Sequence, residues 1–72
     1  MEKRYWVGRV SERDDFGNPI KDQFIDGVMR GRGSWAIMTP AAFRVFGVGK
    51  LGTGYGQRYK KQADGKWLKV EG

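Results

Sequence analysis

The stretch TPAAFRVFG, residues 39–47, contains the strongest helix signal in the chain. Thr39 is a favoured N-cap residue, Pro40 suits the first helical position, and Gly47 is a typical residue at a helix end. Together they predict a short helix at about 39–46, which gives barely two turns.

Two segments before this helix predict a β-hairpin. Residues 20–25 and 34–38 are rich in aromatic and β-branched side chains, which favours strands. The intervening residues 28–33 contain two glycines and two arginines and predict a wide loop. A further N-terminal strand is expected at residues 5–10, before an acidic turn that ends at GNP, residues 17–19.

After the helix comes a glycine-rich loop, GVGKLGTGYGQ, residues 47–57, whose first six residues match the pattern G-x-G-x-x-G. In dinucleotide-binding folds this pattern follows a strand and opens a helix, because the phosphate binds at the helix N-terminus. Here the loop follows a helix and leads into a strand. Leu51 also stands where a P-loop has serine or threonine. We therefore expect a flexible connection.

Residues 57–70 predict a C-terminal β-hairpin in which Asp64 and Gly65 form a two-residue type I′ turn. This turn would pair Lys60 with Lys69 and Gln62 with Trp67, and it would place these four side chains on one face. A tryptophan among lysines is an arrangement that stacks a base while it neutralises phosphate. The alternative interpretation is a solvated edge whose tryptophan covers its neighbours.

The length and composition restrict the function further. A chain of 72 residues has room for one small α+β domain, residues 1–72. Without cysteine or histidine it lacks disulfides and the usual nucleophiles, bases and metal ligands, so we expect no enzyme, no cofactor and no metal. No apolar run approaches the length of a membrane span and no signal-peptide core follows the N-terminus, so a cytoplasmic location is expected.

The charge is concentrated in the second half of the chain. Residues 1–26 carry five basic and six acidic side chains, whereas residues 27–70 carry nine basic side chains and the single acid Asp64. Such a basic segment attracts polyanions, which favours nucleic acid or an acidic protein surface as the partner. The alternative is a cationic surface that only keeps a small protein in solution.

Several short motifs follow one another along residues 13–72. They are GxPI at 17–20, DxFxDG at 22–27, WAxMxP at 35–40, GVG at 47–49, GxGQxY at 54–59 and DGxWxKV at 64–70. In this order they resemble a family of small bacteriophage-encoded proteins of unassigned function with a zinc-ribbon or treble-clef-like fold.

The resemblance implies cysteine zinc ligands at four positions that here hold other residues, namely Arg13, Phe16, Thr39 and Ala42. None of these is a usual zinc ligand, so the resemblance implies a metal-free treble clef. It further implies that Phe16 and Ala42 fill the vacated space and that Thr39 caps the helix. Zinc normally supplies much of the folding energy of such a domain, so other contacts must replace it.

Two functions are compatible with these features. The first is a non-enzymatic nucleic-acid-binding accessory protein of phage origin, acting in the cytoplasm of the bacterial host without a membrane or a small-molecule substrate. Phosphate contacts are expected from Arg30, Arg32, Lys50, Arg58, Lys60 and Lys69, and base stacking from Tyr55 and Trp67. The alternative is a protein-interaction module, such as a phage inhibitor that docks on an acidic surface of a host protein.

Overall fold

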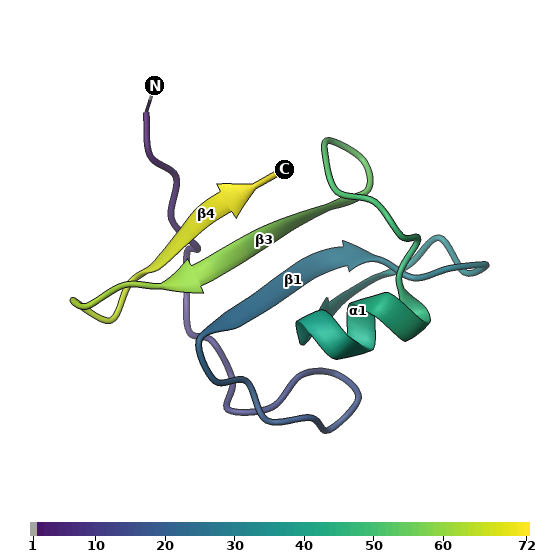
Figure 1. Ribbon diagram of the computed structural model, residues 1–72, viewed down its shortest axis with the longest axis horizontal. Coiled ribbons are helices and arrows are strands. Elements are labelled where there is room, and N and C mark those ends of the chain that lie inside the picture. The colour runs from purple at the N-terminus through teal and green to yellow at the C-terminus, as the bar shows by residue number, and fades with distance from the viewer. Residues whose placement is uncertain (1) are drawn as a thin grey trace.

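The computed structural model describes residues 2–72 and has an α+β architecture, with a four-stranded antiparallel sheet and one short helix (Figure 1). The spatial order of the strands is β2-β1-β3-β4. In chain order the elements are β1 (Gln23–Val28), β2 (Trp35–Met38), α1 (Pro40–Phe46), β3 (Gly56–Lys61) and β4 (Trp67–Glu71).

Helix α1 confirms the expectation from the sequence. The Thr39 hydroxyl accepts a hydrogen bond from the backbone N–H of Ala42 at 3.3 Å, and Pro40 begins the helix. At the other end, the N–H of Gly47 donates to the carbonyl of Phe43 at 2.8 Å. A Cβ at Gly47 would lie 2.2 Å from Cδ1 of Phe43, so lack of space against the Phe43 ring requires glycine here.

The two faces of the sheet are covered differently. Helix α1 lies over β1 and β2 on one face, the helix face, as Figure 1 shows. Ile25 and Met38 are fully buried beneath it, and the buried Phe43 of α1 belongs to the same core cluster. Since successive strand residues point to opposite faces, Phe24 lies on the other face, the back face.

An aromatic cluster fills the back face. Phe24 is fully buried and stacks on Tyr59 of β3 with 5.1 Å between the ring centroids. Trp6 packs edge-on against both rings at 5.3 and 5.4 Å, and Trp67 of β4 lies 5.1 Å from Phe24. Aromatic side chains bury large areas, so these four rings form a second core although the chain is short.

Residues 4–15 form a segment, the N-terminal strap, that crosses the back face and binds both edges of the sheet. At the β4 edge, Lys69 N–H donates to the Arg4 carbonyl at 2.7 Å and Trp6 N–H donates to the Trp67 carbonyl at 2.9 Å. At the β2 edge, Asp15 N–H donates to the Ile37 carbonyl at 2.9 Å. Figure 1 shows this segment passing behind the sheet.

The expected strand at residues 5–10 is therefore wrong. Only Tyr5 forms a bridge, with Leu68 of β4. The backbone then turns at Gly8, whose φ of 99° lies in the left-handed region, and it crosses the strands instead of running beside one of them.

The first hairpin is confirmed, with both ends of β1 shifted, because the strand ends at Val28 and not at residue 25. Strand β1 begins at Gln23, three residues later than the start expected at residue 20. The reason is that the N–H of Ile20 donates to the carbonyl of Glu12 at 2.8 Å, so Ile20 pairs with the strap. Residues 29–34 form the loop to β2, close to the wide loop that was expected.

The second hairpin exists, but its expected register is wrong. Lys61 pairs with Trp67, Lys60 with Leu68 and Tyr59 with Lys69. The loop has three residues, because Gln62 N–H donates to the Lys66 carbonyl at 2.7 Å. A type I′ turn would need a positive φ at Asp64, and no residue other than glycine has one within residues 2–72.

This register divides the side chains that were expected on one face between the two faces of the sheet. Trp67 and Lys69 lie on the back face, opposite Lys61 and Tyr59. Lys60 lies on the helix face, opposite Leu68. The expected Lys60–Lys69 pair therefore does not form, although Lys61 and Lys69 share the back face with Trp67. Lys61 Nζ lies 5.8 Å from the centroid of the Trp67 ring.

Candidate nucleic-acid interface

Three segments meet at one end of the sheet and form a surface that we call the loop end. They are the β1–β2 loop (29–34), the last turn of α1 with the residues after it (44–48), and residues 49–55 of the glycine-rich loop. Arg30 N–H donates to the Phe46 carbonyl at 2.7 Å, and Val48 N–H donates to the Val28 carbonyl at 3.1 Å. Val28 N–H in turn donates to the Tyr55 carbonyl at 2.9 Å. These hydrogen bonds fix the three segments next to one another.

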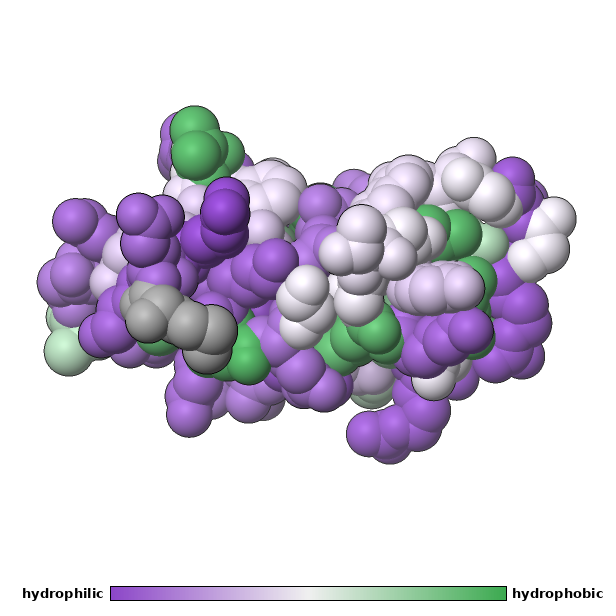
Figure 2. All heavy atoms as spheres, turned by 90° about the horizontal axis from the view of Figure 1, so that it is seen from above, coloured by the Kyte–Doolittle hydropathy of each residue, from purple (hydrophilic) through white to green (hydrophobic). Residues whose placement is uncertain are grey.

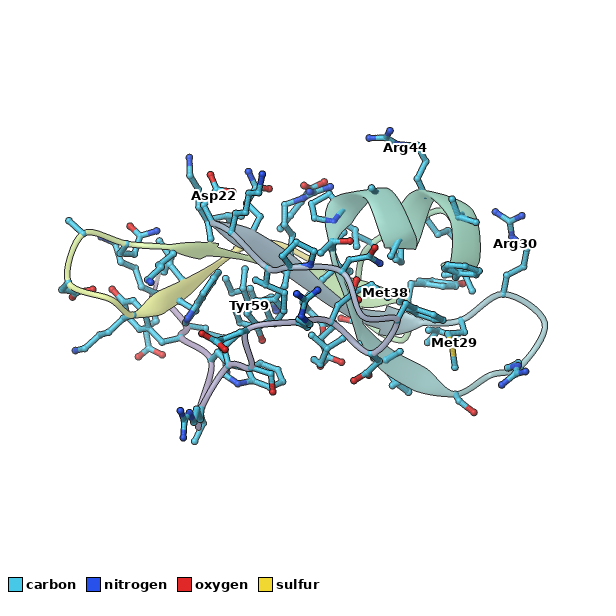
Figure 3. All side chains as sticks on the ribbon, turned by 90° about the horizontal axis from the view of Figure 1, so that it is seen from below. Asp22, Met29, Arg30, Met38, Arg44 and Tyr59 are labelled. Atoms are coloured by element: carbon cyan, nitrogen blue, oxygen red, sulfur yellow. The ribbon has the colours of Figure 1, made fainter. Side chains whose placement is uncertain are left out.

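The loop end is rich in cations and free of acidic side chains from its own segments. It brings together Arg30, Arg32 and Lys50, three of the residues expected to bind phosphate, and adds Arg44 from the last turn of α1. Residues 27–63 contain no aspartate or glutamate. Arg30 and Arg44 extend into solvent on the helix side of the molecule (Figure 3). A polyanion approaching this end therefore meets no nearby carboxylate from these segments.

Exposed aromatic side chains accompany these cations. Tyr55 is 41% exposed, and Lys50 Nζ lies 4.1 Å from the centroid of its ring. Trp35 is 46% exposed at the first position of β2. On the face that Figure 2 shows, the hairpin half is mostly hydrophilic, whereas the loop-end half mixes hydrophilic, near-neutral and hydrophobic residues.

Trp35 and Tyr55 lie on opposite sides of Val28, with strand β1 between them. Val28 pairs with Trp35 on one side and donates its N–H to the Tyr55 carbonyl on the other. Adjacent strands lie about 4.8 Å apart, so the two backbones are about 10 Å apart. Sequence reasoning missed Trp35 and Arg44. The signal that marks Trp35 is a large aromatic residue directly after a glycine-containing loop.

The remaining expected site residues do not join the loop end. Arg58 Nε lies 3.1 Å from Glu71 Oε1, and its Nη1 donates to Gln23 Oε1 at 3.2 Å, so its guanidinium already has partners. This is the one ion pair in the described part of the chain. Trp67 packs in the aromatic cluster of the back face, Lys69 lies on the same face, and Lys60 lies on the helix face. The sequence-based site is thus divided between the loop end and the hairpin.

Asp14 joins the acidic turn to the start of α1. Its Oδ2 accepts from the N–H of Thr39 at 2.8 Å, and its Oδ1 accepts from the N–H groups of Phe16 and Asn18 at 3.0 and 2.8 Å. The Asn18 amide also donates to both oxygens. Burial raises the pKa of Asp14, but these hydrogen bonds outweigh that effect and hold the pKa at about 2.

Of the four positions at which the resemblance implies cysteines, Phe16 and Thr39 donate their N–H groups to this carboxylate. Thr39 caps the helix and Ala42 is buried in the core. Phe16 stacks on Phe46 with ring centroids 4.3 Å apart, and both rings stay partly exposed. In residues 2–72, no group of three or more His, Cys, Asp or Glu side chains is placed to hold a metal ion.

Two further groups on the back face have shifted pKa values. Burial raises the pKa of Asp26 above 3.8, and the negative charge of Asp15 raises it further. Burial and the charge of Asp26 likewise raise the pKa of Tyr59 above 10.0. Figure 3 shows Tyr59 inside the molecule, so these groups belong to the second core and not to the cationic surface.

Comparisons with known proteins give no relative for this chain. No family model matches it, and neither a curated protein nor a solved structure shows a significant match. The likeness to small phage proteins stays a prediction. Within the described residues, no helix is long and apolar enough to cross a membrane.

Proposed function

We propose that this chain is a non-enzymatic nucleic-acid-binding accessory protein whose binding surface is the loop end. The observation that carries the proposal is the gathering of four cations, Arg30, Arg32, Arg44 and Lys50, on segments without a carboxylate, with Lys50 over the exposed ring of Tyr55. Lysine and arginine release counterions from a phosphate backbone, and this release drives binding that weakens as salt rises. Aromatic rings beside these cations add contacts to bases.

We also infer a metal-free treble clef of phage origin, acting in the cytoplasm of the bacterial host. The order of turn, hairpin and short helix supports this inference. The hydrogen bonds of Asp14 support it too, because they connect the turn to the helix start, the two parts that a zinc ion would join.

The test compares two triple variants that remove the same charge from different places. Arg30→Gln, Arg32→Gln and Lys50→Gln remove it from the loop end. The matched control, Lys60→Gln, Lys61→Gln and Lys66→Gln, removes it from the hairpin. Fluorescence anisotropy with labelled single- and double-stranded oligonucleotides, at several salt concentrations, gives the affinity and its salt dependence.

We expect the loop-end variant to bind much more weakly than the control variant. The slope of log K against log salt should become shallower by about 0.7–0.9 for each phosphate that the variant no longer neutralises. Equal losses of affinity in both variants would show that only net charge matters and would contradict the proposed surface. If the unaltered protein binds neither oligonucleotide at low salt, the proposed function is wrong.

A second function has one specific observation in its favour. The Phe16–Phe46 stack exposes apolar surface next to Arg30, whose N–H is bonded to Phe46. Exposed aromatic surface beside arginine is common at protein–protein interfaces. The alternative is therefore a protein-interaction module that docks on an acidic surface of a host protein. It gains support if oligonucleotide binding is absent and Phe16→Ser weakens capture of a host protein.

A further inference from the structure

We propose that the loop end selects single-stranded nucleic acid, with bases stacked on Tyr55 and Trp35 and the adjacent phosphates bound by the surrounding cations. This inference rests on the proposed function and names its substrate class. Bases in a duplex are stacked on one another, whereas single strands offer unstacked bases to aromatic side chains.

Tyr55 is held ready for stacking. Lys50 Nζ sits over the ring at 4.1 Å from its centroid, which occupies one face and restrains the ring. With 41% of the residue exposed, Tyr55 keeps surface that a base can reach. The same ammonium group lies close enough to contact a phosphate of the stacked nucleotide.

Trp35 supplies a second ring at the same end of the sheet. Its position is fixed by pairing with Val28, which also binds the Tyr55 backbone, so two stacking groups stand at a set separation of about 10 Å between backbones. Arg30 and Arg32 lie in the loop that leads into Trp35. Lys50 therefore accompanies the Tyr55 ring, and the two arginines precede Trp35 by five and three residues in the chain.

The glycine-rich loop leaves space beside Tyr55. Gly52 and Gly54 have φ values of 130° and 85°, which side chains rarely adopt, and a Cβ at either position would meet no atom within 4 Å. A strand of nucleic acid can therefore approach this backbone without meeting side chains at the two glycines. The loop contributes access, while Lys50 and Tyr55 contribute the contacts.

The experiment uses a 12-nucleotide oligo(dT) and a blunt duplex of the same length, each labelled for anisotropy at low salt. Tyr55→Leu and Trp35→Leu remove the rings, and Tyr55→Phe keeps one. Tyr5→Leu is the matched control, because Tyr5 is also 41% exposed with Lys66 Nζ 5.7 Å from its ring centroid, but it lies on the β4 edge next to Leu68. Circular dichroism checks that each variant is folded.

We expect the single strand to bind more tightly than the duplex. Tyr55→Leu and Trp35→Leu should each weaken single-strand binding by about tenfold and change duplex binding little, while Tyr55→Phe and Tyr5→Leu keep single-strand affinity. Oligo(dT) should also quench part of the tryptophan fluorescence, and Trp35→Phe should abolish that quenching.

Two results would overturn this inference. The first is equal affinity of the natural protein for single strand and duplex. The second is an equal loss of affinity for both probes in Tyr55→Leu. Either result would mean that the loop end binds phosphates without stacking bases. The proposed function would then survive without its single-strand preference. Absence of binding to either probe would instead remove the proposed function itself.

Discussion

Replacing Asp14 with asparagine tests the contact that connects the acidic turn to helix α1. The aspartate is only 6% exposed, and its two oxygens accept from three backbone N–H groups and from the Asn18 amide. The asparagine side chain would keep the shape of the aspartate but lack its charge. The NH2 group of the asparagine would also take the place of one carboxylate oxygen, so its N–H donors would face N–H groups that now donate to Asp14.

The size of the effect follows from the pKa of Asp14. Burial raises this pKa and the hydrogen bonds lower it by more, so the folded protein holds it at about 2, against 3.8 for an ordinary aspartate. Each pKa unit corresponds to about 1.4 kcal/mol, so the ionised carboxylate stabilises the fold by about 2 kcal/mol. A lowered pKa contributes this stability above pH 4, and the contribution is lost as the pH falls from about 4 to about 2.

Urea denaturation of the natural protein and of Asp14→Asn, at several pH values from 7 to 2.5, measures this contribution. We expect the free energy of unfolding of Asp14→Asn to be about 2 kcal/mol lower than that of the natural protein at pH 7. This difference should narrow as the pH falls below 4. Asp64→Asn is a control, since Asp64 is exposed and accepts a single backbone hydrogen bond, from Lys66 N–H at 2.9 Å. If the difference in free energy of unfolding between Asp14→Asn and the natural protein stays constant with pH, the reasoning is refuted.

Two other predictions concern the cores and the treble-clef inference. Asp26→Asn should stabilise the protein at pH 7, because burial and then Asp15 raise the pKa of Asp26 and disfavour its charge. In denaturation curves this gain in the free energy of unfolding should vanish below about pH 4. A lower free energy of unfolding for Asp26→Asn at pH 7 would contradict the prediction. A variant with cysteine at the positions of Arg13, Phe16, Thr39 and Ala42 should bind cobalt with the absorption of a tetrahedral thiolate site. If cobalt gives no such absorption in a folded variant, the treble-clef inference is wrong.

The helix and the first hairpin were predictable because their signals are local. Thr39 and Pro40 act within the first turn, in the roles that their residue types favour. Gly47 ends the helix as expected, but in an extended conformation with φ of −81°, where the Phe43 ring leaves no room for a Cβ. The loop-end cations were predictable as a charge pattern. Their partners Trp35 and Arg44 were missed, because only the pairing of β1 with β2 and the position of α1 bring them to the same end.

The hairpin register was not predictable from its turn motif. Asp64 and Gly65 fit a two-residue turn, and they fit equally well in a three-residue loop with Gly65 at positive φ. The two loops differ in length by one residue, and this difference changes which side chains face each other across the hairpin. Trp67 then packs on Phe24, a choice that depends on a core built from distant segments.

The N-terminal strap has a consequence for the order of folding. Arg4 is hydrogen-bonded to Lys69, and Trp6 to Trp67. The strap can therefore dock on β4 only after residues more than 60 positions later in the chain have been synthesised. Contacts of such large sequence separation form slowly, because a long loop must close first. Until β4 emerges from the ribosome, the β3 edge and the aromatic rings of the back face lie open to other chains. For this protein, the interval between synthesis and docking of the strap is therefore the period of greatest exposure to aggregation.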